Sequence, residues 1–117
     1  MNTRKVGSAK EDEAARYLTS RGLTILEKNY SNRFGEIDII ALDGNCTVFV
    51  EVKYRKGIGS GHPEEAVGAS KIRKIAKVAD HYRVCRKLSE SDPVRFDVVA
   101  IENDSIRWYR NAFEYPF

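Results

Sequence analysis

The first clear pattern of hydrophobic positions along the chain has the period of a helix. Between residues 8 and 21, Ala14, Ala15 and Leu18 recur at helical spacing, and Gly22 follows where a helix is expected to end. The positions between them are mostly polar or charged. We therefore predict an amphipathic helix that packs one side on a core.

Three apolar runs rich in β-branched residues follow this helix. They cover residues 23–30, 34–42 and 47–54, and Ser31-Asn32 is the expected first turn. The last two runs are joined through residues 43–46, DGNC, which is typical of a β-hairpin. The pattern therefore predicts three consecutive strands, the last two paired as a hairpin.

A second helix and further strands are predicted in the remainder of the chain. A glycine-rich connector at 57–61 precedes a long amphipathic pattern at 63–85, and strand patterns follow at 94–101 and 106–110. A long helix between strands serves as a crossover. The economical architecture is an α/β fold, with a mixed central sheet flanked by helices, formed by residues 1–117 as a single domain.

Charged residues interrupt the apolar pattern where burial is expected. Asp38 lies on the first hairpin strand, and Glu51 and Lys53 lie on the second. A two-residue turn at Asp43-Gly44 would pair Asp38 with Phe49, and a four-residue loop would pair it with Glu51, so either register puts both carboxylates on one side of the sheet. Glu11 shares the apolar side of the first helix. Such buried charges are costly unless they are paired or bound to a metal.

Two interpretations of these charges stay open. In the structural one, Lys53 neutralises Asp38 or Glu51 and fixes the strand register. In the other, one lysine does not balance the charge of two carboxylates, and Glu11 increases the surplus negative charge. A hard divalent cation bound by these carboxylates would neutralise it. Mg²⁺ takes one or two carboxylates and completes its shell with water and phosphate oxygens. A nearby lysine could stabilise negative charge on a phosphoryl group.

Charge is distributed unevenly along the chain. The net charge of the 117 residues is only +3, but residues 53–87 hold ten basic and three acidic residues, a balance of +7, which leaves −4 elsewhere. A charged helix is often just a solvated face, but a negative pocket needs surrounding positive charge to attract an anionic substrate. The candidates for phosphate contacts that do not read bases are Arg33, Arg55, Lys56, Lys71 and Lys74.

Several other classes of protein do not fit the sequence. No apolar run approaches the length of a membrane span, and the start of the chain lacks the apolar stretch of a secretory signal, so a cytoplasmic protein without membrane contact is expected. Cys46 and Cys85 have no metal-ligand spacing and suggest no disulfide framework. Asp97, among apolar strand residues, is interpreted as a structural hydrogen-bonding acid.

The residues around the carboxylates resemble a known family. Residues 35–41, GEIDIIA, and 48–53, VFVEVK, closely resemble the YraN family of small bacterial predicted endonucleases. That family is similar to the archaeal Holliday junction resolvases and belongs to the PD-(D/E)XK nuclease superfamily. The resemblance covers almost the whole chain, because it extends to EDEAARYL at 11–18, GHP at 61–63 and RFDVV at 95–99.

The resemblance implies a restriction-endonuclease-like α-β-β-β-α-β core and a nuclease site. By this similarity, Asp38 and Glu51 ligate Mg²⁺ or Mn²⁺, Lys53 takes the catalytic lysine position, and Glu11 corresponds to an additional helix-borne acid. The implied activity is metal-dependent hydrolysis of phosphodiester bonds in DNA, with branched or structured DNA in repair or recombination as the favoured substrate. Resolvases similar to this family act as two-fold dimers, so the resemblance suggests a homodimer here.

Two other functions stay open from the sequence. One is a catalytically weak or inactive nucleic-acid-binding module that keeps the nuclease fold and recruits a partner. The other is a structural or interaction protein whose carboxylates are simply salt-bridged. The intact set of Asp38, Glu51 and Lys53 argues against a degenerate nuclease site.

Overall fold

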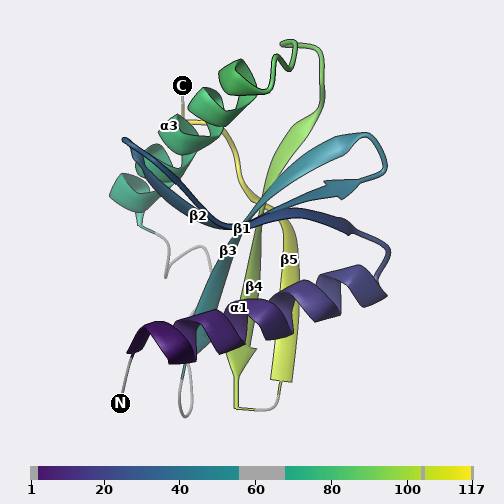
Figure 1. The fold of residues 1–117 in the computed structure, drawn as a ribbon, viewed down its shortest axis with the longest axis vertical. Coiled ribbons are helices and arrows are strands. Elements are labelled where there is room, and N and C mark those ends of the chain that lie inside the picture. The colour runs from purple at the N-terminus through teal and green to yellow at the C-terminus, as the bar shows by residue number, and fades with distance from the viewer. Residues whose placement is uncertain (1–2, 56–67, 104, 117) are drawn as a thin grey trace.

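In a computed structural model, the described residues form a five-stranded sheet with one helix on each face (Figure 1). The structure describes residues 3–55, 68–103 and 105–116. Within the described residues no helix is long and apolar enough to cross a membrane. In chain order the elements are α1 (Thr3–Ser20), β1 (Thr24–Asn32), β2 (Gly35–Asp43), β3 (Cys46–Arg55), α3 (Ala69–Cys85), β4 (Val94–Glu102) and β5 (Ser105–Phe113).

The strands lie in the sheet in the order in which they occur in the chain. Neighbouring strands are antiparallel except β3 and β4, which run parallel along their whole length from Thr47 beside Val94 to Arg55 beside Glu102. A parallel pair needs a crossover, and α3 lies in that connection. The predicted mixed sheet flanked by helices is therefore confirmed, and β5 adds a fifth strand at its edge.

Each helix covers one face of the sheet with its apolar stripe. The face under α3 carries the larger aromatic side chains, and the face under α1 is filled mainly by aliphatic ones. Both clusters include strand residues that are fully buried, so the central strands β2, β3 and β4 are covered on both sides. The cluster under α3 includes Ile75, Ala79 and Tyr82 of the helix with Phe49 and Phe96 of the strands, and the cluster under α1 includes Ala14 and Leu18 with Val48 and Val50.

Two predicted boundaries were wrong. The first helix begins at Thr3 rather than near residue 8, because the apolar stripe marks only the part of a helix that is packed on the core. Ser31 and Asn32 belong to β1, and the turn is Arg33-Phe34. There the Asn32 side-chain oxygen accepts the Phe34 backbone N–H at 2.9 Å, a local turn-forming contact that hydrophobic alternation does not register.

The predicted start of the second long helix lies outside the described residues. Residues 56–67 are not described, so the glycine-rich connector, GHP at 61–63 and Lys56 fall outside the description. The described helix α3 begins at Ala69, after Gly68 in an extended conformation.

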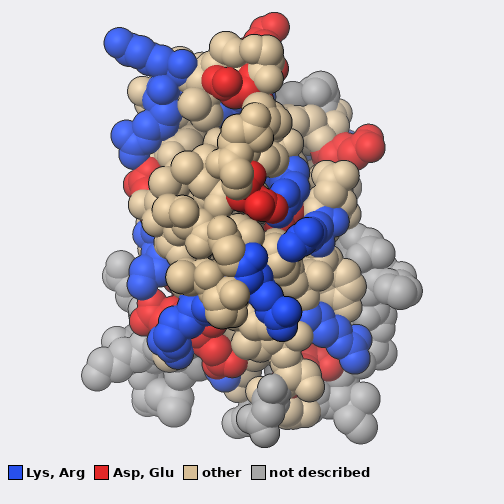
Figure 2. Space-filling model, turned by 90° about the vertical axis from the view of Figure 1, so that its right-hand side faces the viewer, with Lys and Arg blue, Asp and Glu red and all other residues tan. Residues whose placement is uncertain are grey.

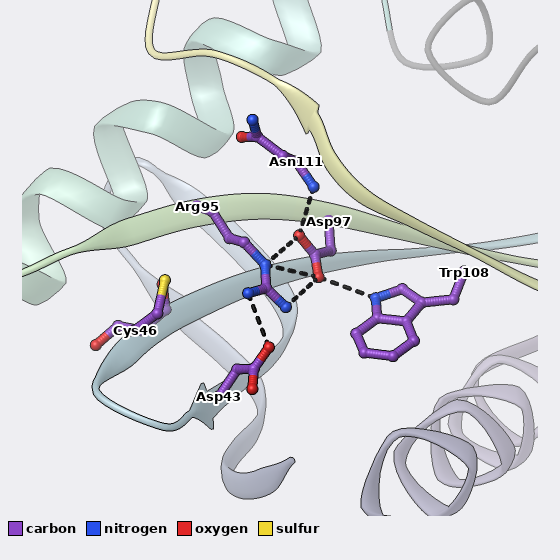
Figure 3. A network of polar contacts seen from close by, with 7 residues as sticks. Asp43, Cys46, Arg95, Asp97, Trp108 and Asn111 are labelled. Carbon is purple, nitrogen blue, oxygen red and sulfur yellow. Dashed lines mark hydrogen bonds and ion pairs between the residues drawn. The ribbon is translucent and has the colours of Figure 1, made fainter. Parts of the chain in front are cut away.

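Asp97 is a fully buried acid in β4 whose two carboxylate oxygens are both engaged (Figure 3). Arg95 donates to it from Nε at 3.0 Å, the Trp108 indole N–H at 2.9 Å and the Asn111 backbone N–H at 2.9 Å. Arg95 also reaches Asp43, at the end of β2, at 2.9 Å. The network ties β4 to β5 and to the hairpin turn, which confirms the structural interpretation of Asp97.

Candidate metal and nucleic-acid site

The hairpin of β2 and β3 opens at the point where its carboxylates occur. Asp43 pairs with Cys46 and Ile39 with Val50, where the ladder between the two strands ends. The connecting loop is Gly44-Asn45, with Gly44 at φ 62°, a conformation that glycine adopts without strain. Of the two registers open from the sequence, this is the one that aligns Asp38 with Glu51, just beyond the last pair.

Asp38 takes the place of the missing backbone partner in this opening. Its Oδ2 accepts the Val52 backbone N–H at 2.8 Å, while β3 itself continues along β4. This bond fixes the orientation of the carboxyl group, because a hydrogen bond from the backbone leaves the side chain little rotational freedom. The other carboxyl oxygen of Asp38 takes no part in this bond, so it is available to neighbouring groups.

Glu51 is the buried member of the pair. Only 8% of the residue is exposed, and burial, followed by the hydrogen bond and charge of Asp38, raises the pKa of Glu51 to about 8. The positive charges of Lys71 and Lys53 act in the opposite direction and favour its ionised form. Two adjacent carboxylates in a site shielded from water repel each other, so a cation is needed to keep both of them ionised.

Glu11 reaches the Asp38 carboxyl group from α1. Burial and the charge of Asp38 raise the pKa of Glu11 to about 7, and the nearby Glu36 acts in the same direction. A hydrogen bond from the Asn29 side chain partly offsets the effect. Oε2 of Glu11 is buried, and among the described residues it has no hydrogen-bond partner. An oxygen in that position is costly unless a proton or a cation joins it.

Two lysines lie near Glu51. Lys71, in the first turn of α3, places its Nζ 3.5 Å from Oε2 of Glu51 and is itself about half exposed. In the structural interpretation Lys53 would pair with a carboxylate, but within the described part of the chain no ion pair joins Lys53 to an acid. Lys53 is close enough to act on the charge of Glu51 and is only partly buried.

The predicted phosphate contacts lie at different distances from these carboxylates. Lys71 is in the site, and Lys74 is exposed one turn further along α3. Arg33 lies in the β1–β2 turn, beside the middle of α3, with its guanidinium over the Phe34 ring. Arg55 is the last residue of β3, and Lys56 lies outside the described residues.

Two groups in the site were not predicted from the sequence. The Val52 backbone N–H orients Asp38, and the Asn29 side chain donates to Glu11. Asn29 has a positive φ of 55°, which asparagine tolerates better than most residues and which marks an irregular position in β1. No pattern of side chains in the sequence could reveal the role of the Val52 backbone N–H. An asparagine within a strand pattern, however, is a signal that could have identified Asn29.

The donor set fits a hard divalent cation. It consists of carboxylate oxygens alone, and one of them is the buried, unpartnered Oε2 of Glu11. Within the part of the chain that the structure describes, no group of three or more acidic, histidine or cysteine side chains is placed so that it could hold a metal ion by itself. Mg²⁺ is commonly bound through one or two carboxylates, with water and phosphate oxygens completing its shell, and Asp38 and Glu51 are an adjacent pair of this kind.

The raised pKa values predict an unusual pH dependence of stability. Because Glu51 ionises near pH 4.5 when unfolded and near 8 when folded, the folded state binds the additional proton, and stability falls as the pH rises through that interval. In EDTA, we expect Glu51→Gln to raise the melting temperature by at least about 4 °C at about pH 8.5 and by clearly less at about pH 5. Thermal unfolding at both pH values measures this difference.

The control for this prediction is Glu13→Gln, an exchange of the same type at a surface position of α1 that pairs with Lys10. It should change the melting temperature little at either pH. An effect of Glu51→Gln that is equal at both pH values would contradict a proton held at Glu51 in the folded state.

Comparison with known proteins places the whole chain among closely similar sequences. The model of "Uncharacterised protein family UPF0102" matches residues 10–101. A UPF0102 protein of Lachnoclostridium phytofermentans is 47% identical over 114 residues, which cover 97% of each chain. One of Persephonella marina is 43% identical over 111 residues and 95% of each chain, and one of Vibrio cholerae is 42% identical over 115 residues, 96% of this chain and 94% of the other.

Proposed function

The chain belongs to the uncharacterised protein family UPF0102, and from this premise we propose that it is a divalent-metal-dependent endonuclease. Its substrate is DNA, with branched or structured DNA favoured, and its reaction is hydrolysis of a phosphodiester bond. The order α1-β1-β2-β3-α3-β4 agrees with the restriction-endonuclease-like core that the sequence resemblance implies. A homodimer and a cytoplasmic location stay predictions from the sequence.

One observation carries the proposal. Where the hairpin opens, Asp38 of β2 interacts with Glu51 of β3 and with Glu11 of α1, and the pKa values of Glu11 and Glu51 are raised to about 7 and about 8. A fold that needed these residues only for stability would gain by replacing them with neutral ones, because their burial and mutual repulsion disfavour ionisation. Clustered, perturbed carboxyl groups are typical of functional sites, and oxygen-only ligands indicate a hard cation.

The residues have distinct tasks in this proposal. Asp38 and Glu51, with Glu11 beside them, would hold Mg²⁺ or Mn²⁺, which when bound supplies Lewis-acid polarisation and a lowered pKa of bound water. The Val52 N–H keeps Asp38 in position. Lys53 places a positive charge beside the carboxylates, where it can stabilise negative charge that develops on the phosphoryl oxygens.

The distribution of basic side chains supports an anionic substrate on the α3 side. Lys71, Arg73, Lys74 and Lys77 are all exposed along that helix. Figure 2 shows a different face, seen from the right-hand side of Figure 1; there, on the described part, basic side chains occur in separate groups divided by acidic and neutral ones. Positive charge near a negative site draws a polyanion toward it and makes binding sensitive to salt.

A catalytically inactive binding module is the second candidate. The contact between Lys71 and Glu51 favours it, because a lysine can replace a cation as the partner of that carboxylate. Without bound metal, the basic residues of α3 would still contact phosphates. The two candidates differ in metal binding and turnover, and both predict binding of DNA.

The test combines metal binding with cleavage on the same preparations. Isothermal titration of Mg²⁺ and Mn²⁺ should give a saturable site, and labelled four-way junction, duplex and single-stranded DNA should be cut with metal and not in EDTA. Because protons compete with metal for Glu11 and Glu51, affinity should rise between about pH 6 and about pH 8.5. Binding of DNA without metal binding or cleavage would leave the binding module as the function.

A further inference from the structure

A groove lies between the β1–β2 turn and the outer side of α3, apart from the carboxylates. It has a volume of about 340 Å³. Two of the large hydrophobic side chains exposed on the surface line it: Phe34, 37% exposed, and Val84, 74% exposed. Exposed apolar side chains that gather in one groove indicate a place of contact. The other lining residues are Arg33, Lys77, Asp80 and His81.

The turn is held firmly against α3, as Figure 1 also shows. The Asn32 side-chain amide donates to the Val78 carbonyl at 3.4 Å, and the Phe34 ring meets His81 edge-on with centroids 5.7 Å apart. Gly35, at φ 143°, lies so close to Val78 that a Cβ there would stand 3.4 Å from its side chain. Phe34 is therefore a fixed aromatic surface rather than a free loop side chain.

The positive charges around Phe34 suit a ligand that carries phosphate groups. The Arg33 guanidinium lies 4.8 Å from the centre of the Phe34 ring, and Lys77 borders the same groove. Among the described residues neither Arg33 nor Lys77 has an acidic partner within ion-pair distance. Of the described residues that line the groove, Asp80 is the one acid, so these residues carry an excess of positive charge. An apolar groove with unpaired cations at its border fits a ligand with a flat apolar part and an anionic part.

We propose that this groove binds an unpaired DNA base, stacked on Phe34, while Arg33 and Lys77 contact the adjoining phosphates. The choice of DNA as the ligand rests on the proposed function. Aromatic side chains beside basic ones form the usual surface for single-stranded nucleic acid, because every base has a face that can stack. A fully paired duplex offers no such base away from its ends, so the groove favours splayed or branched DNA.

The position of the groove suits a strand that also reaches the carboxylates. Phe34 precedes Asp38 by four residues of β2 and its turn, which corresponds to about 13 Å of extended strand. That length equals roughly four nucleotide steps along one strand of a duplex. A DNA strand that follows β2 from Phe34 in a duplex-like conformation would therefore reach the level of Asp38 within a few nucleotides. The groove then selects the substrate and the carboxylates act on it.

The test measures DNA binding in EDTA, so that it needs neither metal nor cleavage. The variants are Phe34→Leu, which keeps an apolar side chain without a stacking surface, and Phe34→Trp, which keeps the stacking surface. The probes are labelled oligothymidylate, a forked duplex with unpaired arms and a blunt duplex of equal length. The control variant is Leu26→Ala, an exposed apolar residue of β1, 41% exposed, that does not line the groove.

We expect Phe34→Leu to weaken binding of oligothymidylate and of the forked duplex by about 5- to 100-fold. Its affinity for blunt duplex should stay within about twofold, because phosphate contacts persist. Phe34→Trp and Leu26→Ala should bind all three probes like the wild type, and fluorescence of the new tryptophan should be quenched by oligothymidylate. Equal affinities of Phe34→Leu and wild type for the unpaired probes would overturn the proposal, as would an equal loss on all three probes.

The outcome is independent of the proposed catalysis. If the wild type cuts DNA but Phe34→Leu binds unpaired DNA normally, the nuclease stands and the stacking surface fails. If the wild type does not cut any DNA but Phe34→Leu selectively loses unpaired probes, the stacking surface stands and the nuclease fails.

Discussion

Replacing Asp38 with asparagine is expected to lower the rate of DNA cleavage by roughly a thousandfold or more. Asparagine is nearly the same size, and its side-chain oxygen can still accept the Val52 N–H that now binds Asp38 at 2.8 Å. The exchange therefore removes the negative charge that a divalent cation requires and preserves the local hydrogen bond. Single-turnover cleavage of a labelled four-way junction at saturating Mn²⁺ measures the loss.

The matched control for Asp38→Asn is Asp12→Asn on α1. Asp12 is also an acid near this edge of the sheet, but its partner is Lys28 at 2.7 Å and it is well exposed, so its exchange should leave cleavage unchanged. DNA binding in EDTA should persist in both variants, because the phosphate contacts come from lysines and arginines. Cleavage by Asp38→Asn at the wild-type rate would show that the carboxylate pair is not the catalytic metal site.

Replacing Asp97 with alanine is expected to destabilise the protein by about 3–5 kcal/mol. Asp97 is fully buried, and its removal leaves the Trp108 indole N–H and the Asn111 backbone N–H without an acceptor. Arg95 would keep its contact with Asp43. Since a small domain has a total stability of about 5–15 kcal/mol, this change would consume a large part of it. Urea unfolding followed by circular dichroism measures the difference.

A milder variant keeps this prediction testable if Asp97→Ala does not fold. Trp108→Phe removes one donor to Asp97, which lies at 2.9 Å, and retains most of the apolar ring, so we expect a loss of about 1–2 kcal/mol. Asp12→Ala, which breaks only an exposed ion pair, should cost less than about 1 kcal/mol. If the Asp97 and Trp108 variants are no less stable than Asp12→Ala, the network does not stabilise the fold as described.

The elements of the fold could be predicted well from the sequence because their hydrophobic periods are distinct. Ala14 and Leu18 at helical spacing and the alternating strands around DGNC each occur within a short window, and both α1 and the β2–β3 hairpin are present. The first turn was misplaced because Asn32 continues the strand and then closes the turn with its side chain. Such a contact depends on a single rotamer, which alternation of apolar residues does not encode.

The candidate carboxylates could also be recognised from the sequence alone. Asp38 and Glu51 stand out because they are charged residues in strands that must be buried, and Glu11 because it interrupts the apolar side of a helix. Alternation put the first two on one side of the sheet in either register. Their roles in metal binding and catalysis stay predictions, and the experiments above test them.

What the sequence determined by itself was therefore the local pattern: which segments are helices or strands, which sides are apolar, and which charges lie on them. The tertiary structure decided that β3 separates from β2 after Val50 while it stays paired with β4, and this opening lets Asp38 accept the Val52 N–H. It also brought Lys71 to Glu51 and Phe34 to His81. These contacts join residues far apart in the chain, and they depend on how the helices pack on the sheet, which short-range periodicity cannot specify.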